Sequence, residues 1–97
     1  MAKGYWVSCY QSIDNPEKLA AYAKLAAPAI LAAGGRFVVR GTAAKAYEQG
    51  LVQRTVIVEF DSLAAANAAH DGPGYQEALR VLGDGVKRDF RIVEGVG

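Results

Sequence analysis

Residues 34–41 read Gly-Gly-Arg-Phe-Val-Val-Arg-Gly, and this stretch determines how the rest of the chain is interpreted. The two opening glycines are typical of a helix end, since glycine adopts the left-handed conformation without strain. The alternation after them is typical of a half-buried strand, so Phe37 and Val39 should share one face. Arg36 and Arg40 should share the other, about 13 Å apart at ~3.3 Å per residue. Because covered guanidinium groups need a partner, this face predicts a carboxylate, a subunit or a ligand opposite it.

The segment before this stretch predicts a strand followed by a helix. Residues 4–10 are rich in aromatic and β-branched types and bulky on both faces, as in a central strand. Cys9, the only cysteine, is expected to be a buried strand residue without a catalytic role. Asp14 can cap a helix whose first turn holds Pro16, and this helix should run to residue 33 with a kink at Pro28.

The segment after it predicts more strands and a helix pair. Residues 42–48 resemble a weak edge strand, with Gln49-Gly50 as a hairpin turn, and residues 51–60 form the strongest strand pattern. Ser62 can cap a helix that ends near residue 71, and a further helical segment follows over residues 75–82. Residues 89–94 predict the last strand. In the strand over 51–60, Glu59 should lie on the same mixed face as the two arginines.

The composition restricts the class of protein. A chain of 97 residues predicts one domain, 1–97, and 52% hydrophobic with 22% charged residues is ordinary for a globular protein. A formal net charge of +1 argues against partners such as nucleic acid or an anionic membrane surface. No apolar run is long enough to span a membrane, no signal peptide is recognisable, and one cysteine allows no internal disulfide. A cytoplasmic location is therefore expected.

The order of elements predicts an α+β fold, a ferredoxin-like split βαβ domain with an antiparallel sheet and helices on one face only. The open face would mix Arg36, Arg40 and Glu59 with Val38 and Ile57. This mixture is too apolar for water and too charged for a dry core. It favours a homodimer in which the open faces of two subunits oppose each other.

Five motifs together resemble a known bacterial family. They are Lys-Gly-Tyr-Trp-Val at 3–7, the stretch at 34–41, Val-Glu-Phe-Asp-Ser at 58–62, Tyr-Gln-Glu-Ala at 75–78 and Ile-Val-Glu-Gly at 92–95. The family is a domain of unknown function, DUF1330. The resemblance implies a dimeric α/β barrel, in which two ferredoxin-like sheets form one assembly, but it implies no activity. The chain departs from the family pattern at Asp61, where proline is usual, and at Gly74, where glutamate is usual.

Three residues are candidates for catalysis, since the resemblance matches two of them and chemistry singles out the third. Arg40 could hold a carboxylate or an enolate, with Glu59 as its orienter or as a general base. The equal alternative is a structural ion pair that braces the sheet or the dimer. His70 is the only histidine and the side chain that titrates nearest neutrality, although a capping or exposed role also fits its position.

Four further residues are candidates for ligand contact. Arg36 could bind an acidic group or be a solvated surface arginine. Tyr5 and Trp6, with Tyr10, could wall a small pocket or simply be core aromatics. Tyr75 could supply a hydroxyl group or an apolar face. No metal and no cofactor is expected, because one histidine and one cysteine on separate elements make no metal site and no phosphate-binding glycine loop precedes a helix.

Three functions fit these residues. The first is a cofactor-independent enzyme acting on a small carboxylated or carbonyl-bearing metabolite in a cleft between sheet and helices. The second is a non-catalytic dimer that binds such a molecule. The third is a protein-interaction dimer in which the Arg/Glu cluster is structural.

Overall fold

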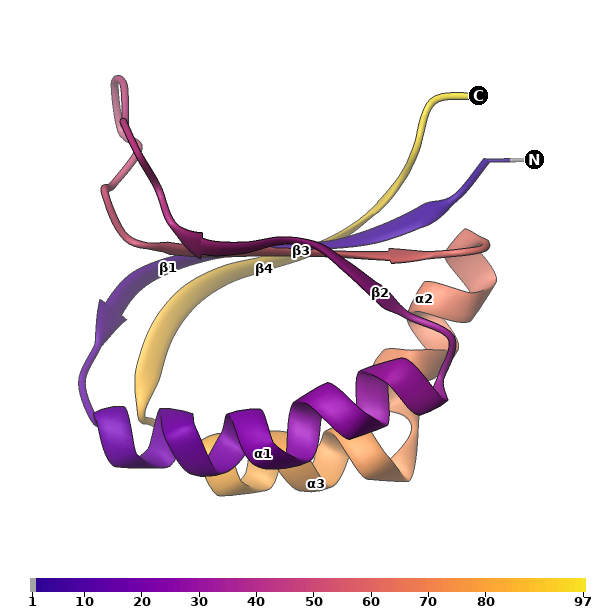
Figure 1. The fold of residues 1–97 in the computed structure, drawn as a ribbon, viewed down its shortest axis with the longest axis horizontal. Helices are drawn as coiled ribbons and strands as arrows, with labels where there is room; N and C mark the ends of the chain where they lie inside the picture. Colours follow the sequence, from indigo (N-terminus) through magenta and orange to yellow (C-terminus); the bar gives the residue numbers. More distant parts are fainter. Residues whose placement is uncertain (1) are drawn as a thin grey trace.

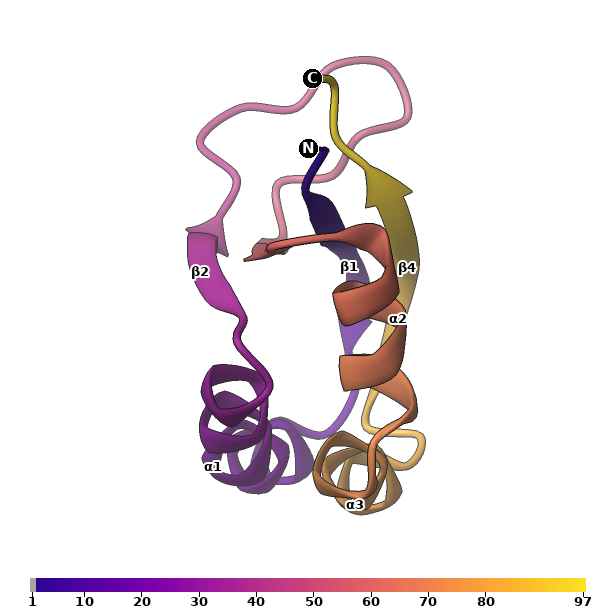
Figure 2. The ribbon, with the colours of Figure 1, turned by 90° about the vertical axis from the view of Figure 1, so that its right-hand side faces the viewer.

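The computed structural model describes residues 2–97 (Figure 1). Its elements are β1 (Gly4–Ile13), α1 (Pro16–Ala32), β2 (Arg36–Thr42), β3 (Arg54–Phe60), α2 (Leu63–Asp71), α3 (Pro73–Leu82) and β4 (Val86–Glu94). The strands form one antiparallel sheet in the order β2-β3-β1-β4. The helices lie on one side of it, as Figures 1 and 2 show together. The predicted α+β, ferredoxin-like architecture is confirmed, with β1 as a central strand.

The first helix begins one residue later than predicted. Asn15 is its N-cap, and its side chain accepts a hydrogen bond from the Lys18 amide at 3.1 Å. Asp14 is not the cap; its amide and that of Asn15 both donate to the Gly85 carbonyl at 2.8 Å, beside the start of β4. The helix continues through Pro28 to Ala32.

The connection from α1 to β2 requires both glycines, for different reasons. Gly34 has φ of +89°, a left-handed conformation that strains other residues. Gly35 is buried where a Cβ atom would lie 2.7 Å from Cγ2 of Ile30 and 2.9 Å from the Phe60 ring. The chain therefore turns tightly from the helix into the strand while staying against the core.

The predicted edge strand over residues 42–48 is wrong beyond Thr42. Residues 43–53 form a loop, which is closed at its base by a hydrogen bond from the Ala43 amide to the Gln53 carbonyl at 2.9 Å. A turn within it joins the Gly50 amide to the Tyr47 carbonyl, also at 2.9 Å. Val52, which the predicted strand over residues 51–60 includes, is 61% exposed in this loop.

A β-bulge in β2 changes which side chains face the helices. Phe37 pairs with Val58, but the next pair along the strand is Val39 with Ile57, so Val38 is an extra residue. The alternation predicted across residues 36–40 is therefore wrong after Phe37. Val39 lies on the open face of the sheet, and Arg40 lies on the face that the helices cover.

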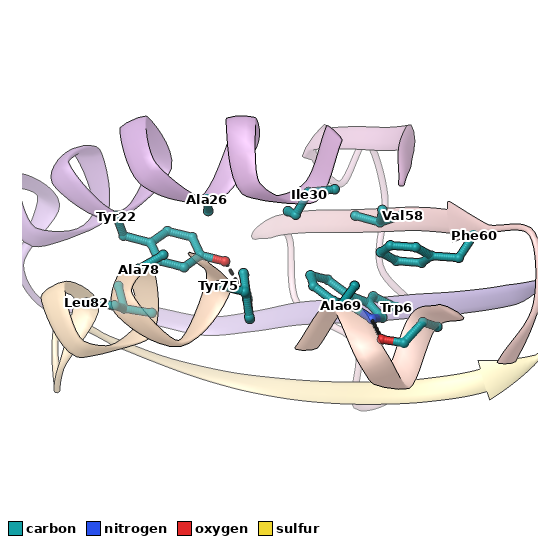
Figure 3. Packing of buried hydrophobic residues seen from close by; sticks show 11 residues of the cluster. Trp6, Tyr22, Ala26, Ile30, Val58, Phe60, Ala69, Tyr75, Ala78 and Leu82 are labelled. Carbon is teal, nitrogen blue, oxygen red and sulfur yellow. Dashed lines mark hydrogen bonds between the residues drawn. The ribbon is translucent and has the colours of Figure 1, made fainter. Parts of the chain in front are cut away.

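The core lies between the sheet and the helices (Figure 3). Trp6 is its centre: the ring is 2% exposed and its centroid lies 4.6 Å from that of Tyr75 and 5.0 Å from that of Phe60. Its Nε1 atom donates to the Ala66 carbonyl at 2.9 Å, which fixes α2 on β1. Cys9 was expected to be buried but is exposed, because it lies on the open face.

None of the helices within residues 2–97 combines the length and the hydropathy that crossing a bilayer requires.

Candidate functional site

The helix-facing side of the sheet changes from apolar to polar along the strands. Pairing across β2, β3, β1 and β4 aligns its side chains in rows, one residue from each strand. The apolar row is Phe37, Val58, Trp6 and Ile92. The middle row is Arg40, Val56, Ser8 and Phe90. The polar row contains Arg54 on β3, Tyr10 on β1 and Arg88 on β4. Three arginines are thus concentrated at one end of an otherwise apolar surface.

A cavity of about 80 Å³ lies over these rows. Its roof is the inner face of α1, where alanines and Ile30 leave room above the sheet, and its floor includes all three arginines. At roughly 10–15 Å³ for each water-sized group, it has room for a ligand with a handful of non-hydrogen atoms. The lining within residues 2–97 contains no carboxylate.

Arg88 is the centre of a hydrogen-bonded group that we call the inner cluster, formed by Arg88, Tyr10, Tyr22 and Tyr75. Nη1 of Arg88 donates to the hydroxyl of Tyr10 at 3.2 Å and to that of Tyr22 at 3.3 Å. Nη2 donates to the hydroxyl of Tyr75 at 3.1 Å. The Tyr22 and Tyr75 hydroxyls are 2.6 Å apart and hydrogen-bonded, as Figure 3 shows. Four elements, β1, α1, α3 and β4, therefore meet at this guanidinium.

The charge of Arg88 has no opposite charge beside it. In the described part of the chain, no carboxylate oxygen lies within 4.0 Å of its guanidinium, although such pairs are found for Arg36, Arg80 and Arg91. The phenol oxygens satisfy its hydrogen bonds but are neutral. A half-buried guanidinium in this state attracts an anion strongly, because the surrounding aromatic rings exclude water.

The Tyr75 hydroxyl of the inner cluster is a hydrogen-bond donor at neutral pH. Burial of the Tyr75 hydroxyl raises its pKa well above the usual range, and the neighbouring Tyr22 raises this pKa further. Tyr75 therefore stays protonated and cannot act as a base. With Arg88, it can instead donate to the oxygen of a bound carboxylate or carbonyl group.

Two more arginines, Arg40 and Arg54, form what we call the outer pair. Arg40 opposes Val56 and Arg54 opposes Thr42, so the two are diagonal neighbours on one face, about 7–8 Å apart at the backbone. The Arg40 guanidinium lies 4.4 Å from the centroid of the Phe37 ring, and its residue is exposed. Neither arginine of the outer pair has a carboxylate within 4.0 Å among residues 2–97.

Two polar atoms beside the cavity have no hydrogen-bond partner within residues 2–97. One is Nε of Arg54, which is buried. The guanidinium carbon of this residue lies 5.9 Å from the centroid of the Tyr10 ring. The other is Oγ of Ser8, in the middle row, whose residue is only 3% exposed. Buried polar atoms normally have partners, so a polar ligand or ordered water is needed here.

The predicted pair of Arg40 with Glu59 does not exist, because the bulge puts these residues on opposite faces. Glu59 lies on the open face with Arg36, whose Nε donates to it at 3.1 Å, and with Tyr5, whose hydroxyl donates to it at 2.9 Å. Arg36 also contacts Asp61 at 3.1 Å. The Tyr5 hydroxyl and then Arg36 hold the pKa of Glu59 below its usual range.

His70, the third catalytic candidate, also lies outside the cavity lining. Its ring packs against the core aromatics, with centroids 5.4 Å from Tyr75 and 5.4 Å from Phe90. Its Nδ1 atom is 3.2 Å from a carboxylate oxygen of Asp71. Of the seven predicted site residues, the structure thus brings Arg40, Trp6 and Tyr75 to the cavity.

Four polar residues that line the cavity are not among the site residues predicted from the sequence: Ser8, Tyr22, Arg54 and Arg88. Strand parity carried a signal for two of them. Arg54 alternates in phase with Val56, and Arg88 alternates in phase with Phe90, so both should face the helices as their apolar neighbours do. Arginine in phase with core residues is the pattern that could have identified them.

Within residues 2–97, no three side chains of the types that commonly bind metal ions (His, Cys, Asp, Glu) cluster closely enough to hold one.

Comparisons with known proteins agree with this architecture. The model of a family described as "Domain of unknown function (DUF1330)" matches residues 3–96. No curated protein matches the chain. Among solved structures, a protein of unknown function from Rhodopseudomonas palustris is similar, with 17% identity, a TM-score of 0.77, and coverage of 99% of this chain and 84% of that chain.

Two other similar structures have informative descriptions. SnoaB from Streptomyces nogalater, a cofactor-independent oxygenase, is 13% identical, with a TM-score of 0.67 over 100% of this chain and 96% of its own. A dimeric ferredoxin-like protein of unknown function from Thermobifida fusca is 14% identical, with a TM-score of 0.63 over 98% of this chain and 92% of its own. At such identities the likeness establishes a shared fold alone.

Proposed function

Because this chain belongs to the DUF1330 family, whose description assigns no activity, we propose a function from the geometry of its own cavity: it binds a small carboxylated molecule at the inner cluster. The observation that carries this proposal is the half-buried Arg88 guanidinium, which faces the cavity with three tyrosine hydroxyls and no carboxylate within the described residues. A ligand carboxylate would supply the missing negative charge.

The apolar part of the cavity supports a ligand with a short hydrocarbon portion. Trp6, Val58 and Phe37 line the end of the cavity away from Arg54 and Arg88. A small molecule with one acidic end and one apolar end would therefore place each end against matching chemistry. The carbonyl-bearing metabolites named above fit less well, because a neutral carbonyl group would leave the charge of Arg88 unbalanced.

Fluorescence of Trp6 tests this proposal, since Trp6 is the only tryptophan and lines the cavity. Titration with butyrate or benzoate should change its emission and saturate. Arg88→Gln should weaken binding about tenfold or more, as expected for the loss of a charge-assisted hydrogen bond. Arg91→Gln, which removes the same charge from the open face, should not. A saturable signal that Arg88→Gln leaves unchanged, or no binding of any carboxylate, would contradict the proposal.

Loss of folding must be separated from loss of binding in this test. Arg88 joins four elements through its hydrogen bonds. Each variant should therefore first be shown to have the circular dichroism spectrum of the folded protein and to unfold cooperatively. Arg88→Lys provides a second variant, because lysine keeps the positive charge but lacks the planar set of N–H donors of a guanidinium group. It should bind more weakly than the wild type and more tightly than Arg88→Gln.

Catalysis is the second candidate function, and the likeness to SnoaB favours examining it. A cofactor-independent reaction would use the Tyr75 hydroxyl and the Arg88 guanidinium as hydrogen-bond donors to a developing oxyanion. Glu59 and His70 would not take part in it, since neither lines the cavity. Incubation of a bound carboxylate with the protein in air, followed by mass spectrometry of the small molecules, separates turnover from binding alone.

A homodimer through the open face is part of the same proposal. A central apolar row crosses that face, with Val39, Ile57 and Val7 from neighbouring strands, and Val39 is 43% exposed in the single chain. The T. fusca neighbour is described as dimeric. The charged residues around this row, including Arg36 and Glu59, could meet their counterparts across a two-fold axis. The free Cys9 beside the row fits a cytoplasmic, reducing location.

Native mass spectrometry tests the dimer directly. The wild-type protein should be a dimer, and Val39→Asp should be a monomer, since a charge in an apolar interface has no partner. Val52→Asp is the matched control, because Val52 is exposed in the loop over residues 43–53. A wild-type monomer at micromolar concentration would rule out the opposed-sheet assembly.

A further inference from the structure

The positive charge that lines the cavity extends beyond the inner cluster to Arg54 and Arg40. Arg54 and Arg88 belong to one row, on the strands that flank β1, so their backbones are about 10 Å apart at roughly 4.8 Å per strand. Their guanidinium carbons lie 5.9 and 5.5 Å from the centroid of the same Tyr10 ring. Both side chains thus turn toward the middle of the polar row.

The outer pair has its own unfilled requirement for hydrogen bonds. Nε of Arg54 is buried and has no partner in the described part of the chain, in contrast to the guanidinium of Arg88, whose donors reach three hydroxyls. Arg40 is a diagonal neighbour of Arg54 and brings a second positive charge to the same end of the cavity. An anion at this end would fill the orphaned donor and balance the charge of the pair.

Building on the binding function proposed above, we infer that the ligand is a short dicarboxylate, with one carboxylate on the inner cluster and the other on the outer pair. A carboxylate carbon lies roughly 4 Å from the guanidinium carbon that binds it. Since the guanidinium carbons of Arg54 and Arg88 lie 5.9 and 5.5 Å from one ring centroid, a ligand that bridges them can have no more than a few ångströms between its carboxylate carbons. This limit allows a linker of about two carbon atoms, as in succinate.

The orphaned Ser8 hydroxyl supports the same assignment. Ser8 lies on β1 between the two basic ends, and its Oγ atom is buried without a partner among residues 2–97. It can donate to an oxygen of either carboxylate or to a hydroxyl group on the linker. A ligand that spans the polar row would therefore satisfy both orphaned atoms at once.

A chain-length series tests the inference, with Trp6 fluorescence as the readout. Succinate should bind about tenfold or more tightly than butyrate, as expected for a second charge-assisted contact. Malonate and pimelate should bind more weakly than succinate, because one is too short and the other too long. Tightest binding by malonate or by inorganic phosphate would overturn the inference, since both would indicate one compact site for a doubly charged anion.

Variants of the outer pair test which residues hold the second carboxylate. Arg54→Gln should weaken the best dicarboxylate about tenfold and change butyrate binding less than about twofold. Arg91→Gln is the matched control and should change neither. If Arg54→Gln fails to fold, Arg40→Gln replaces it, because Arg40 is exposed and its guanidinium packs over the Phe37 ring. Equal weakening of both ligand classes would overturn the inference.

The outcomes also separate this inference from the function on which it depends. If monocarboxylates bind at Arg88 and dicarboxylates bind no more tightly, the proposed function stands and the two-ended ligand is wrong. If no carboxylate of either class binds the wild-type protein, both are wrong.

Discussion

Arg40 and Glu59 lie on opposite faces of the sheet, although β2 and β3 are hydrogen-bonded neighbours. The bulge at Val38 causes this separation, because it shifts the pairing from Phe37 with Val58 to Val39 with Ile57. Arg36 lies on the other side of the bulge and forms an ion pair with Glu59. Simple alternation would place Arg40 on the same face as this pair. One extra residue thus gives the cavity an arginine and leaves the open face with a complete ion pair.

This separation predicts additive effects on stability. The destabilisation of Arg40→Ala and that of Glu59→Gln should sum in the double variant, because residues without contact do not couple. Arg36→Ala and Glu59→Gln should not sum, since Arg36 loses its partner in either case. Urea unfolding of both cycles measures the difference. Coupling between Arg40 and Glu59 would place them on one face and contradict the bulge.

The glycine at the start of β2 should be essential for stability. Gly35→Ala should destabilise the fold by about 1–3 kcal/mol, because the new methyl group overlaps Ile30 and Phe60. Gly41→Ala, at the other end of the strand, is the matched control. A Cβ atom there meets nothing within 4 Å and φ is not positive, so the change should be neutral or stabilising by up to about 1 kcal/mol. Denaturant unfolding compares the two.

Glu59 should contribute to stability at neutral pH and lose this contribution in acid. Its folded-state pKa is depressed by the Tyr5 hydroxyl and by Arg36, so the stabilisation is present above the unfolded pKa near 4.5 and disappears as pH falls through the lower folded value. The thermal midpoint of Glu59→Gln should therefore lie below that of the wild type at pH 7 and approach it at pH 3. Glu48→Gln, in the exposed loop, should show no such convergence. A constant difference across this range would refute the assignment.

Cys9 should report whether the open face is covered in solution. It is exposed in the single chain, so a monomer should react rapidly with a thiol reagent at any concentration. In a dimer through this face, the reaction should be slow at high protein concentration and faster on dilution. Val39→Asp should restore rapid modification. A fast rate that does not depend on concentration would argue against the opposed-sheet dimer.

Local signals in the sequence determined most of the fold. Gly34-Gly35, Pro16 and Ser62 mark element ends through backbone chemistry that acts within a few residues, and Ser62 caps α2 as predicted. The aromatic and β-branched residues over 4–10 predicted a central strand, and β1 is one, although only its face with Trp6, Ser8 and Tyr10 is buried. The family resemblance, confirmed over residues 3–96, agrees with the same order of elements.

The site was decided by the tertiary structure, for two physical reasons. A bulge depends on how two strands register against each other, so no pattern within β2 alone could show that Arg40 faces the helices. The inner cluster joins Tyr10, Tyr22, Tyr75 and Arg88 from four separate elements, and only packing of α1 and α3 against the sheet brings their hydroxyls around one guanidinium. The sequence therefore specified most of the elements, whereas cross-strand register and helix packing selected the residues that meet in the cavity.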